Sequence, residues 1–141
     1  MACYLQLARA DRLNSGVRRM EISSNLFRVI PQADLDLAVQ SGLVPRCAAD
    51  ERSGCVHLNL WQDVETVANA YFTAEERPVA LEIRRADIDA RLVVGPPAPG
   101  KPWQQITLHQ PNILLNSVVA VHRLEISHSG ARSSFRLATG A

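Results

Sequence analysis

The sequence has little excess charge of either sign, no long hydrophobic run, and few cysteine or aromatic residues. Its 141 residues include 15 Lys+Arg and 14 Asp+Glu, and this near balance argues against a broad nucleic-acid-binding surface. The apolar runs are far shorter than the roughly 20 residues of a membrane-spanning helix, so we expect no contact with a membrane. The hydrophobic fraction is 47%, which at this length predicts one globular domain.

The three cysteines, Cys3, Cys47 and Cys55, form no Cys-x-x-Cys pair. An odd number at these spacings argues against a disulfide framework and a zinc site, so we expect no metal. Cys47 and Cys55 could meet across a short loop, but two small buried thiols in a reducing compartment account better for them. We therefore expect a cytoplasmic protein. Nucleophilic catalysis by Cys55 with His57 is disfavoured, because no third group that would orient the histidine is evident.

The segment Met1–Arg19 carries four arginines against one acid, Asp11. It reads either as an organelle transit peptide or as an extension from an upstream start, with Met20 as the natural beginning, and we favour the second. A short helix over Leu5–Leu13 is compatible with both. We expect an N-terminal extension over 1–24, a single domain over 25–126, and a flexible tail over 127–141.

Apolar periodicity then places the elements. Alternating or β-branched runs predict strands over 25–30, 55–60, 78–83, 91–95, 103–109 and 118–126. Helical spacing predicts helices over 32–40 and 61–72, the second with Trp61 and Tyr71 on its buried face, and one helical turn over 85–90. The polar segment 46–54 and the proline-rich segment 96–102 are expected to be loops. Because helices and strands stop alternating halfway, we predict an α+β fold of small split sheets, antiparallel or mixed, with two to three helices.

The familiar phosphate-binding, metal-binding and hydrolase motifs are absent. The strand around His57 has apolar residues on one face and Cys55, His57 and Asn59 on the other, and such a polar face can line a cleft. His109 ends another strand, before Gln110-Pro111, where a side chain can turn into a pocket. No two histidines have the spacing of a local metal pair.

Several segments, in order, resemble a bacterial family named domain of unknown function 952. The resemblance covers about residues 25–125. The family's first strand, its first helix and the glycine that ends this helix are similar to Phe27–Ile30, Ala33–Ala38 and Gly42. Its Gly-Phe-Ile-His strand is similar to Gly54–Asn59, with His57 on the histidine. A later family histidine falls on His109 when Val118-Val119 are placed on the family's paired valines.

The resemblance implies a fold similar to that of the ADP-ribosyltransferases, in which small antiparallel sheets enclose an NAD cleft. It implies His57 and His109 as catalytic residues, and Arg28, His57 and Asn59 as residues that hold NAD or a similar nucleotide. Of Arg28 and Arg46, the two candidates for a phosphate contact, we favour Arg28.

The chain departs from the family at three places: Pro111-Asn112 replaces Tyr-Gly, no glutamate stands near Val94-Gly95, and Leu35 takes the place of a tryptophan. Either of the two available strand glutamates, Glu82 and Glu125, could face a cleft, but we expect both to face solvent. Two hypotheses follow: a transferase that uses His57, and a binding module that has lost the catalytic acid. A metal enzyme is a weaker third. The strand Val118–Val121 could pair two copies, but nothing in the residues decides the oligomeric state.

Overall fold

A computed structural model describes residues 25–97, 99–129 and 132–138. A four-stranded antiparallel sheet runs in the order β1-β4-β8-β9. These strands are β1 (Leu26–Ile30), β4 (Val79–Ile83), β8 (Val118–Ser129) and β9 (Arg132–Leu137). All five residues of β1 are buried, although the strand lies at the edge of this sheet, because other elements pack on both of its faces.

A second antiparallel sheet has the order β3-β6-β5. Its strands are β3 (Val56–Leu58), β6 (Gln105–Leu108) and β5 (Leu92–Gly95). The two sheets meet where Phe27 and Asn59 exchange backbone hydrogen bonds of 2.8 and 2.7 Å. Asn59 directly follows β3, so this bridge places the residues at the end of β3 beside β1.

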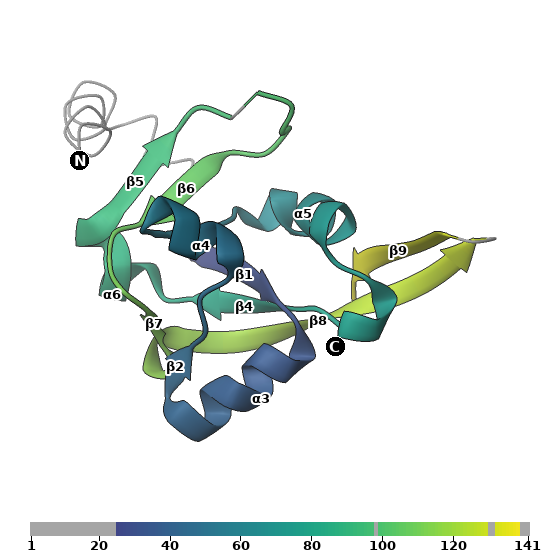
Figure 1. The fold of residues 1–141 in the computed structure, drawn as a ribbon, viewed down its shortest axis with the longest axis horizontal. Helices are drawn as coiled ribbons and strands as arrows, with labels where there is room; N and C mark the ends of the chain where they lie inside the picture. Colours follow the sequence, from purple (N-terminus) through teal and green to yellow (C-terminus); the bar gives the residue numbers. More distant parts are fainter. Residues whose placement is uncertain (1–24, 98, 130–131, 139–141) are drawn as a thin grey trace.

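Among the described residues, four helices and a two-residue strand pair surround the sheets (Figure 1). The helices are α3 (Gln32–Ser41), α4 (Ala48–Ser53), α5 (Val64–Tyr71) and α6 (Arg85–Ile88). The pair consists of β2 (Leu43–Val44) and β7 (Ile113–Leu114). Single 3-10 turns cover Trp61–Asp63, Ala74–Glu76, Asp89–Arg91 and Leu115–Ser117.

The alternation of side chains along β1 and β4 divides the core in two. One cluster collects Leu26, Ile30 and Leu81 with Val94 of β5 and apolar residues of β3 and β6. The other collects Phe27, Val29 and Ala80 with the buried face of α5. Successive residues of a strand point to opposite faces, so a strand buried on both sides contributes to both clusters.

The predicted α+β class with antiparallel sheets is confirmed, and the three predicted helical segments are present. The prediction of a loop over 46–54 is wrong, because α4 forms there. Asp50 accepts a hydrogen bond from the backbone N–H of Cys47 at 3.0 Å, which caps the helix start, and Gly54 ends the helix with a φ of 77°. The polar composition of this segment predicted a loop, but the side chain of Asp50 points into the protein rather than into solvent.

The residues of the predicted buried stripe on 61–72 divide between core and surface. Val64, Val67 and Ala68 are buried, whereas Trp61 is 46% exposed and Tyr71 is 54% exposed. Trp61 lies in the 3-10 turn before α5, so it does not follow the helical spacing. It packs instead against Phe27 and His122, with ring centroids 5.0 Å away in both cases.

Residues 132–137, which we expected in a flexible tail, form β9. Its central residue Phe135 is 2% exposed and pairs with Ile126 in β8. The hairpin of β8 and β9 projects from one end of the molecule, and α5 lies against β9 (Figure 1). The predicted N-terminal extension over 1–24, with its short helix, lies outside the described residues.

Cys47 is an exposed free thiol and Cys55 a buried one. The alternative in which these two cysteines form a disulfide across a short loop is therefore not realised. Within the described ranges, no helix has the length and apolar character needed to cross a membrane.

Candidate functional site

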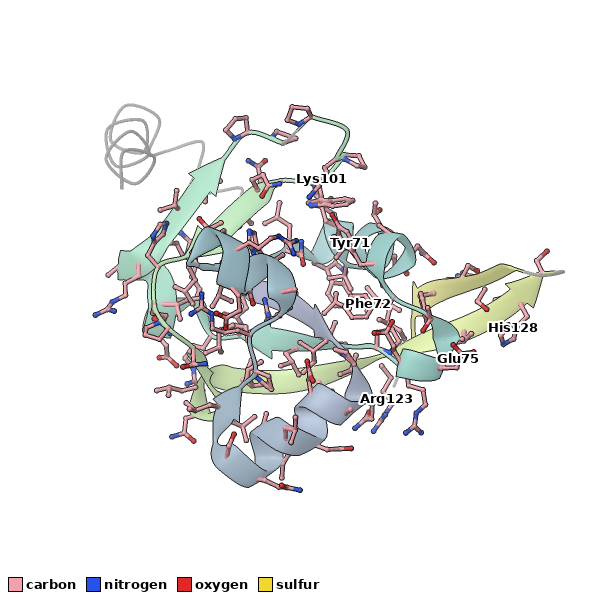
Figure 2. The ribbon with its side chains drawn as sticks, viewed as in Figure 1. Tyr71, Phe72, Glu75, Lys101, Arg123 and His128 are labelled. Atoms are coloured by element: carbon pink, nitrogen blue, oxygen red, sulfur yellow. The ribbon has the colours of Figure 1, made fainter. Side chains whose placement is uncertain are left out.

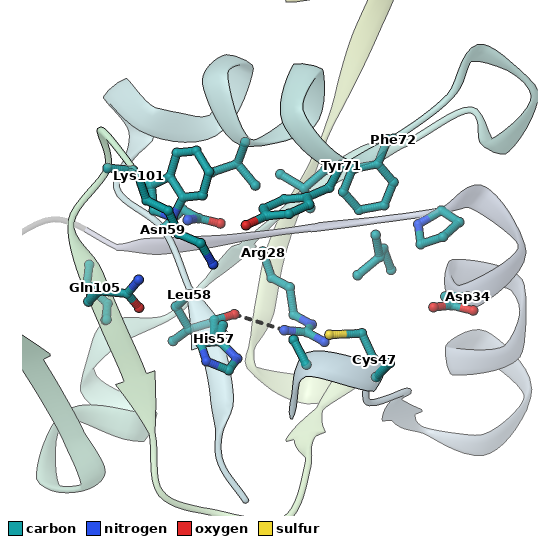
Figure 3. A pocket seen from close by; sticks show the side chains of 18 of the residues that line it. Arg28, Asp34, Cys47, His57, Leu58, Asn59, Tyr71, Phe72, Lys101 and Gln105 are labelled. Carbon is teal, nitrogen blue, oxygen red and sulfur yellow. Dashed lines mark hydrogen bonds between the residues drawn. The ribbon is translucent and has the colours of Figure 1, made fainter. Parts of the chain in front are cut away.

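A pocket of about 580 Å³ opens where β1 and the end of β3 come together. Its walls come from β1, the start of α3, α4, β3, α5 and the segment that leads into β6. Figure 3 shows His57, Arg28 and Cys47 along one side, and Asn59, Tyr71 and Lys101 along the other. The pocket therefore draws on both sheets and on three helices.

His57 is the central residue of β3, between the buried Val56 and Leu58. Alternation along the strand turns its ring away from the core, and the side chain is 35% exposed. The predicted polar face of this strand is thus realised at His57, which lines the pocket.

Asp50 on α4 forms hydrogen bonds with His57 and does not itself line the pocket. Its Oδ1 accepts hydrogen bonds from the backbone N–H of His57 at 3.1 Å and from the ring Nδ1 at 2.9 Å. Its Oδ2 accepts from the backbone N–H of Cys47 and from the guanidinium of Arg28. The Asp50 side chain is completely inaccessible to solvent. These protein donors therefore take the place that water would have around an exposed carboxylate.

Arg28 on β1 completes the arrangement. One terminal nitrogen donates to the carbonyl of His57 at 2.8 Å, and the other pairs with Asp50 and reaches the carbonyl of Pro45 at 3.5 Å. Its side chain leaves β1 on the face opposite Phe27 and Val29, and it lines the pocket. The guanidinium is nevertheless occupied by Asp50, so its main task here is structural.

The charges in this cluster depend on one another. Burial alone would raise the pKa of Asp50, but the hydrogen bond from His57 and the positive charge of Arg28 favour the ionised form more strongly. The pKa of Asp50 consequently lies well below its ordinary value. Ionised Asp50 and protonated Arg28 form a buried ion pair, and loss of either partner would leave an uncompensated charge in the interior.

The remaining walls are aromatic and polar. Tyr71 and Trp103 make an edge-to-face pair with centroids 5.6 Å apart. The Lys101 ammonium lies 5.6 Å from the Tyr71 ring centroid and 6.0 Å from that of Trp103, a cation–π arrangement. Figure 2 shows Lys101 close to Tyr71. Asn59, only 8% exposed, points its amide into the pocket (Figure 3).

The structure brings Arg28, His57 and Asn59 together but leaves two other candidates outside the pocket lining. His109 lies just beyond β6, at the opposite end of that strand from the pocket-lining Gln105. The backbone N–H of His109 donates to the carbonyl of Arg91 at 2.9 Å. Arg46, the less favoured phosphate candidate, donates to the backbone carbonyl of Asp50 at 2.9 Å.

The expectation that Glu82 faces solvent is wrong. Its carboxylate accepts from Asn25 at 2.8 Å and contacts His122 Nε2 at 2.7 Å, on the sheet face that carries Trp61 and Phe27. The hydrogen bonds from Asn25 and His122 lower the pKa of Glu82. Glu125 is exposed on the projecting half of β8, as expected. Neither glutamate lines the pocket.

Sequence reasoning missed Asp50, the residue that organises the site. A signal was available: an arginine within the apolar strand Phe27–Ile30 needs a buried carboxylate partner. The acids of the polar segment before His57 were among the candidates. The aromatic wall was missed for another reason, because Tyr71 and Trp103 were assigned to a helix core and to a strand.

In the part of the chain that the structure describes, no three His, Cys, Asp or Glu side chains gather as metal ligands would. The polar side chains that line the pocket include an imidazole, amides, a phenol, the cations of Arg52 and Lys101, and the acids Asp34 and Glu76. Such a set can hydrogen-bond a polar organic molecule and stack against its planar part.

No family model matches the chain, and no curated protein sequence matches it. Its fold is similar to the crystal structure of protein CC0527 from Caulobacter crescentus, with a TM-score of 0.67 at 18% sequence identity, over 80% of this chain and 94% of that one. A double mutant of CC0527 superposes with a TM-score of 0.66 at the same identity and coverage. At this identity the likeness establishes a shared fold.

Proposed function

We propose that this protein binds a small nucleotide-like molecule, with ADP-ribose and NAD as the first candidates, in the pocket beside His57. One observation carries the proposal: a buried ion pair, Arg28–Asp50, holds the partly exposed His57 at the pocket wall. Buried ion pairs contribute little net stability by themselves, because desolvation offsets much of their attraction. Their arrangement around His57 is therefore more readily explained by a role at the pocket.

The walls suit this class of ligand. A volume of about 580 Å³ falls within the usual range for small-molecule sites. The rings of Tyr71 and Trp103 offer apolar surface for a planar base, and the amide of Asn59 can donate to and accept from hydroxyl groups. Lys101 and Arg52 are the exposed cations that could meet a phosphate.

The same reasoning extends to the fold, for which we propose a relationship to the ADP-ribosyltransferases. Two antiparallel sheets that meet at Phe27 and Asn59, with His57 beside the junction, support it. Free thiols at Cys47 and Cys55 support a reducing location such as the cytoplasm.

Within this proposal we favour binding without transfer. An acid that stabilises a positively charged sugar centre would have to face the ligand, and Glu82 and Glu125 lie elsewhere. The acids that line the pocket are Asp34 and Glu76, and Glu76 accepts hydrogen bonds from Thr73. We expect NAD incubated with the protein to remain intact, as judged by chromatography of the nucleotide and of free nicotinamide. Steady release of nicotinamide would restore the transferase hypothesis.

Isothermal titration calorimetry with ADP-ribose, NAD and AMP tests the binding itself. We expect saturable binding that His57→Ala weakens about tenfold or more, the effect of losing one or two good hydrogen bonds. His109→Ala is the matched control, because it removes a histidine that does not line the pocket, and it should bind like the unchanged protein. Absence of binding to all three compounds, or equal weakening by both substitutions, would contradict the proposal.

A further inference from the structure

We infer that Asp50 fixes His57 as the tautomer protonated at Nδ1, so that Nε2 is the proton-accepting atom of the pocket wall and selects ligands that present a hydroxyl group to it. This inference rests on the proposed function and adds to it a chemical requirement on the ligand. Asp50 is a positioning residue in this scheme, since it lies behind the ring.

The direction of each hydrogen bond follows from the charge of Asp50. An ionised carboxylate can only accept, and the buried Arg28 keeps Asp50 ionised. The ring atom 2.9 Å from Oδ1 must therefore carry a proton, which assigns N–H to Nδ1. A neutral imidazole carries one proton, so Nε2 presents a lone pair.

Hydrogen bonds to the backbone N–H and to the carbonyl of His57 hold the residue in the position that this tautomer requires. The carboxylate oxygen that holds Nδ1 also accepts the backbone N–H of His57 at 3.1 Å, and the carbonyl of His57 accepts from Arg28 at 2.8 Å. Asp50 has no exposed surface, so water cannot replace it as the partner of Nδ1. Rotation of the ring would leave a buried carboxylate oxygen with one donor fewer.

The first test is spectroscopic and needs no ligand. In long-range proton–nitrogen spectra of the ¹⁵N-labelled protein near pH 8, His57 should show a protonated Nδ1 and an unprotonated Nε2, with the resonance identified by its loss in His57→Gln. A predominant Nε2–H tautomer would overturn the inference.

The second test removes the positioning group. Asp50→Asn should release the tautomer preference, so that an Nε2–H population appears, while circular dichroism reports whether the fold persists. Should this variant fail to fold because Arg28 is left unpaired, Arg28→Met with Asp50→Asn removes the buried charge and repeats the test. An unchanged Nδ1–H tautomer in a folded variant would show that Asp50 does not set it.

The third test measures whether binding depends on a hydroxyl group of the ligand. ADP-ribose analogues in which single hydroxyls are replaced by hydrogen are titrated into the protein and into His57→Ala. One analogue should lose about tenfold in affinity for the protein and almost nothing for the variant, as expected of a directly coupled pair. If ADP-ribose binds and every analogue binds equally well, the inference fails. If nothing binds, the proposed function fails, and the tautomer spectrum alone decides the role of Asp50.

Discussion

Asp50 is the residue on which the site depends, although it touches no open part of the pocket. It is completely buried, it neutralises Arg28, and it accepts two hydrogen bonds from His57. Replacement of one partner in a buried, hydrogen-bonded ion pair is costly, because the remaining charge has neither water nor a counter-ion.

We therefore expect Asp50→Ala to lower the free energy of unfolding by about 3–5 kcal/mol, as measured by urea denaturation at pH 7. Asp36→Ala is the matched control, since Asp36 is an exposed residue of α3, and it should change stability by less than about 0.5 kcal/mol. Similar effects of the two substitutions would refute the structural role of Asp50.

The same residue predicts a pH dependence. Because folding lowers the pKa of Asp50, its contribution is fully present above the ordinary carboxyl pKa of 3.8 and is lost progressively as the pH falls below that value. Between pH 5 and pH 2.5 the unchanged protein should lose more unfolding free energy than Asp50→Asn, which has no carboxyl to titrate there. Parallel stability curves for the two proteins would contradict the lowered pKa.

The sequence pointed to Arg28, His57 and Asn59 through strand alternation and a family resemblance, and the structure places all three at one pocket. It did not point to Asp50, because burial of a polar residue depends on partners distant in the chain. Arg28 is 22 residues away from it, on another element. An arginine within an apolar strand indicates that a buried acid pairs with it, but the pattern of neighbouring residues does not show which distant acid this is.

At the scale of elements, β9 shows most clearly how tertiary contacts override local preference. Its residues are rich in serine and arginine, and Phe135 is the one buried residue among 133–137. Asn69 on α5 donates to the carbonyl of Phe135 at 3.1 Å and accepts its N–H at 2.8 Å. Glu65, on the same helix, accepts the N–H of Leu137 at 2.7 Å. These side chains act as an additional strand along the edge of β9.

Asn69→Ala should consequently loosen β9 while the rest of the protein remains folded. We expect hydrogen exchange at the Phe135 amide to accelerate at least about tenfold, since two backbone groups lose their partner. Thr66→Ala, an exposed change on the same helix, is the control and should leave the exchange rate unchanged. Equal rates in all three proteins would mean that the β8–β9 pairing alone orders this strand.

For the whole molecule, the pocket is a product of assembly rather than of any one segment. β1 and β3 belong to different sheets and meet at the Phe27–Asn59 bridge, while α4, α5 and the segment before β6 close the walls. Apolar periodicity was sufficient to predict the α+β class and most strands. Apolar periodicity could not predict which segments line one pocket, because that depends on how the two sheets are joined.

Cys47 provides a probe for this space, because it is exposed and lines the pocket whereas Cys55 is buried. In a Cys3→Ser background, ADP-ribose at roughly ten times its Kd should slow alkylation of Cys47 about tenfold, in proportion to the unoccupied fraction. Cys47→Ser shows whether any labelling comes from Cys55. An alkylation rate independent of ADP-ribose would place the ligand elsewhere.

The most direct test of a nucleotide pocket beside His57 is a titration of the ¹⁵N-labelled protein with ADP-ribose, followed by amide chemical shifts. We expect saturable changes at His57, Asn59 and Tyr71, which surround the pocket, and almost none at His128 on the distant β8–β9 hairpin (Figure 2). Absence of saturable changes, or changes confined to residues outside the pocket walls, would contradict the account.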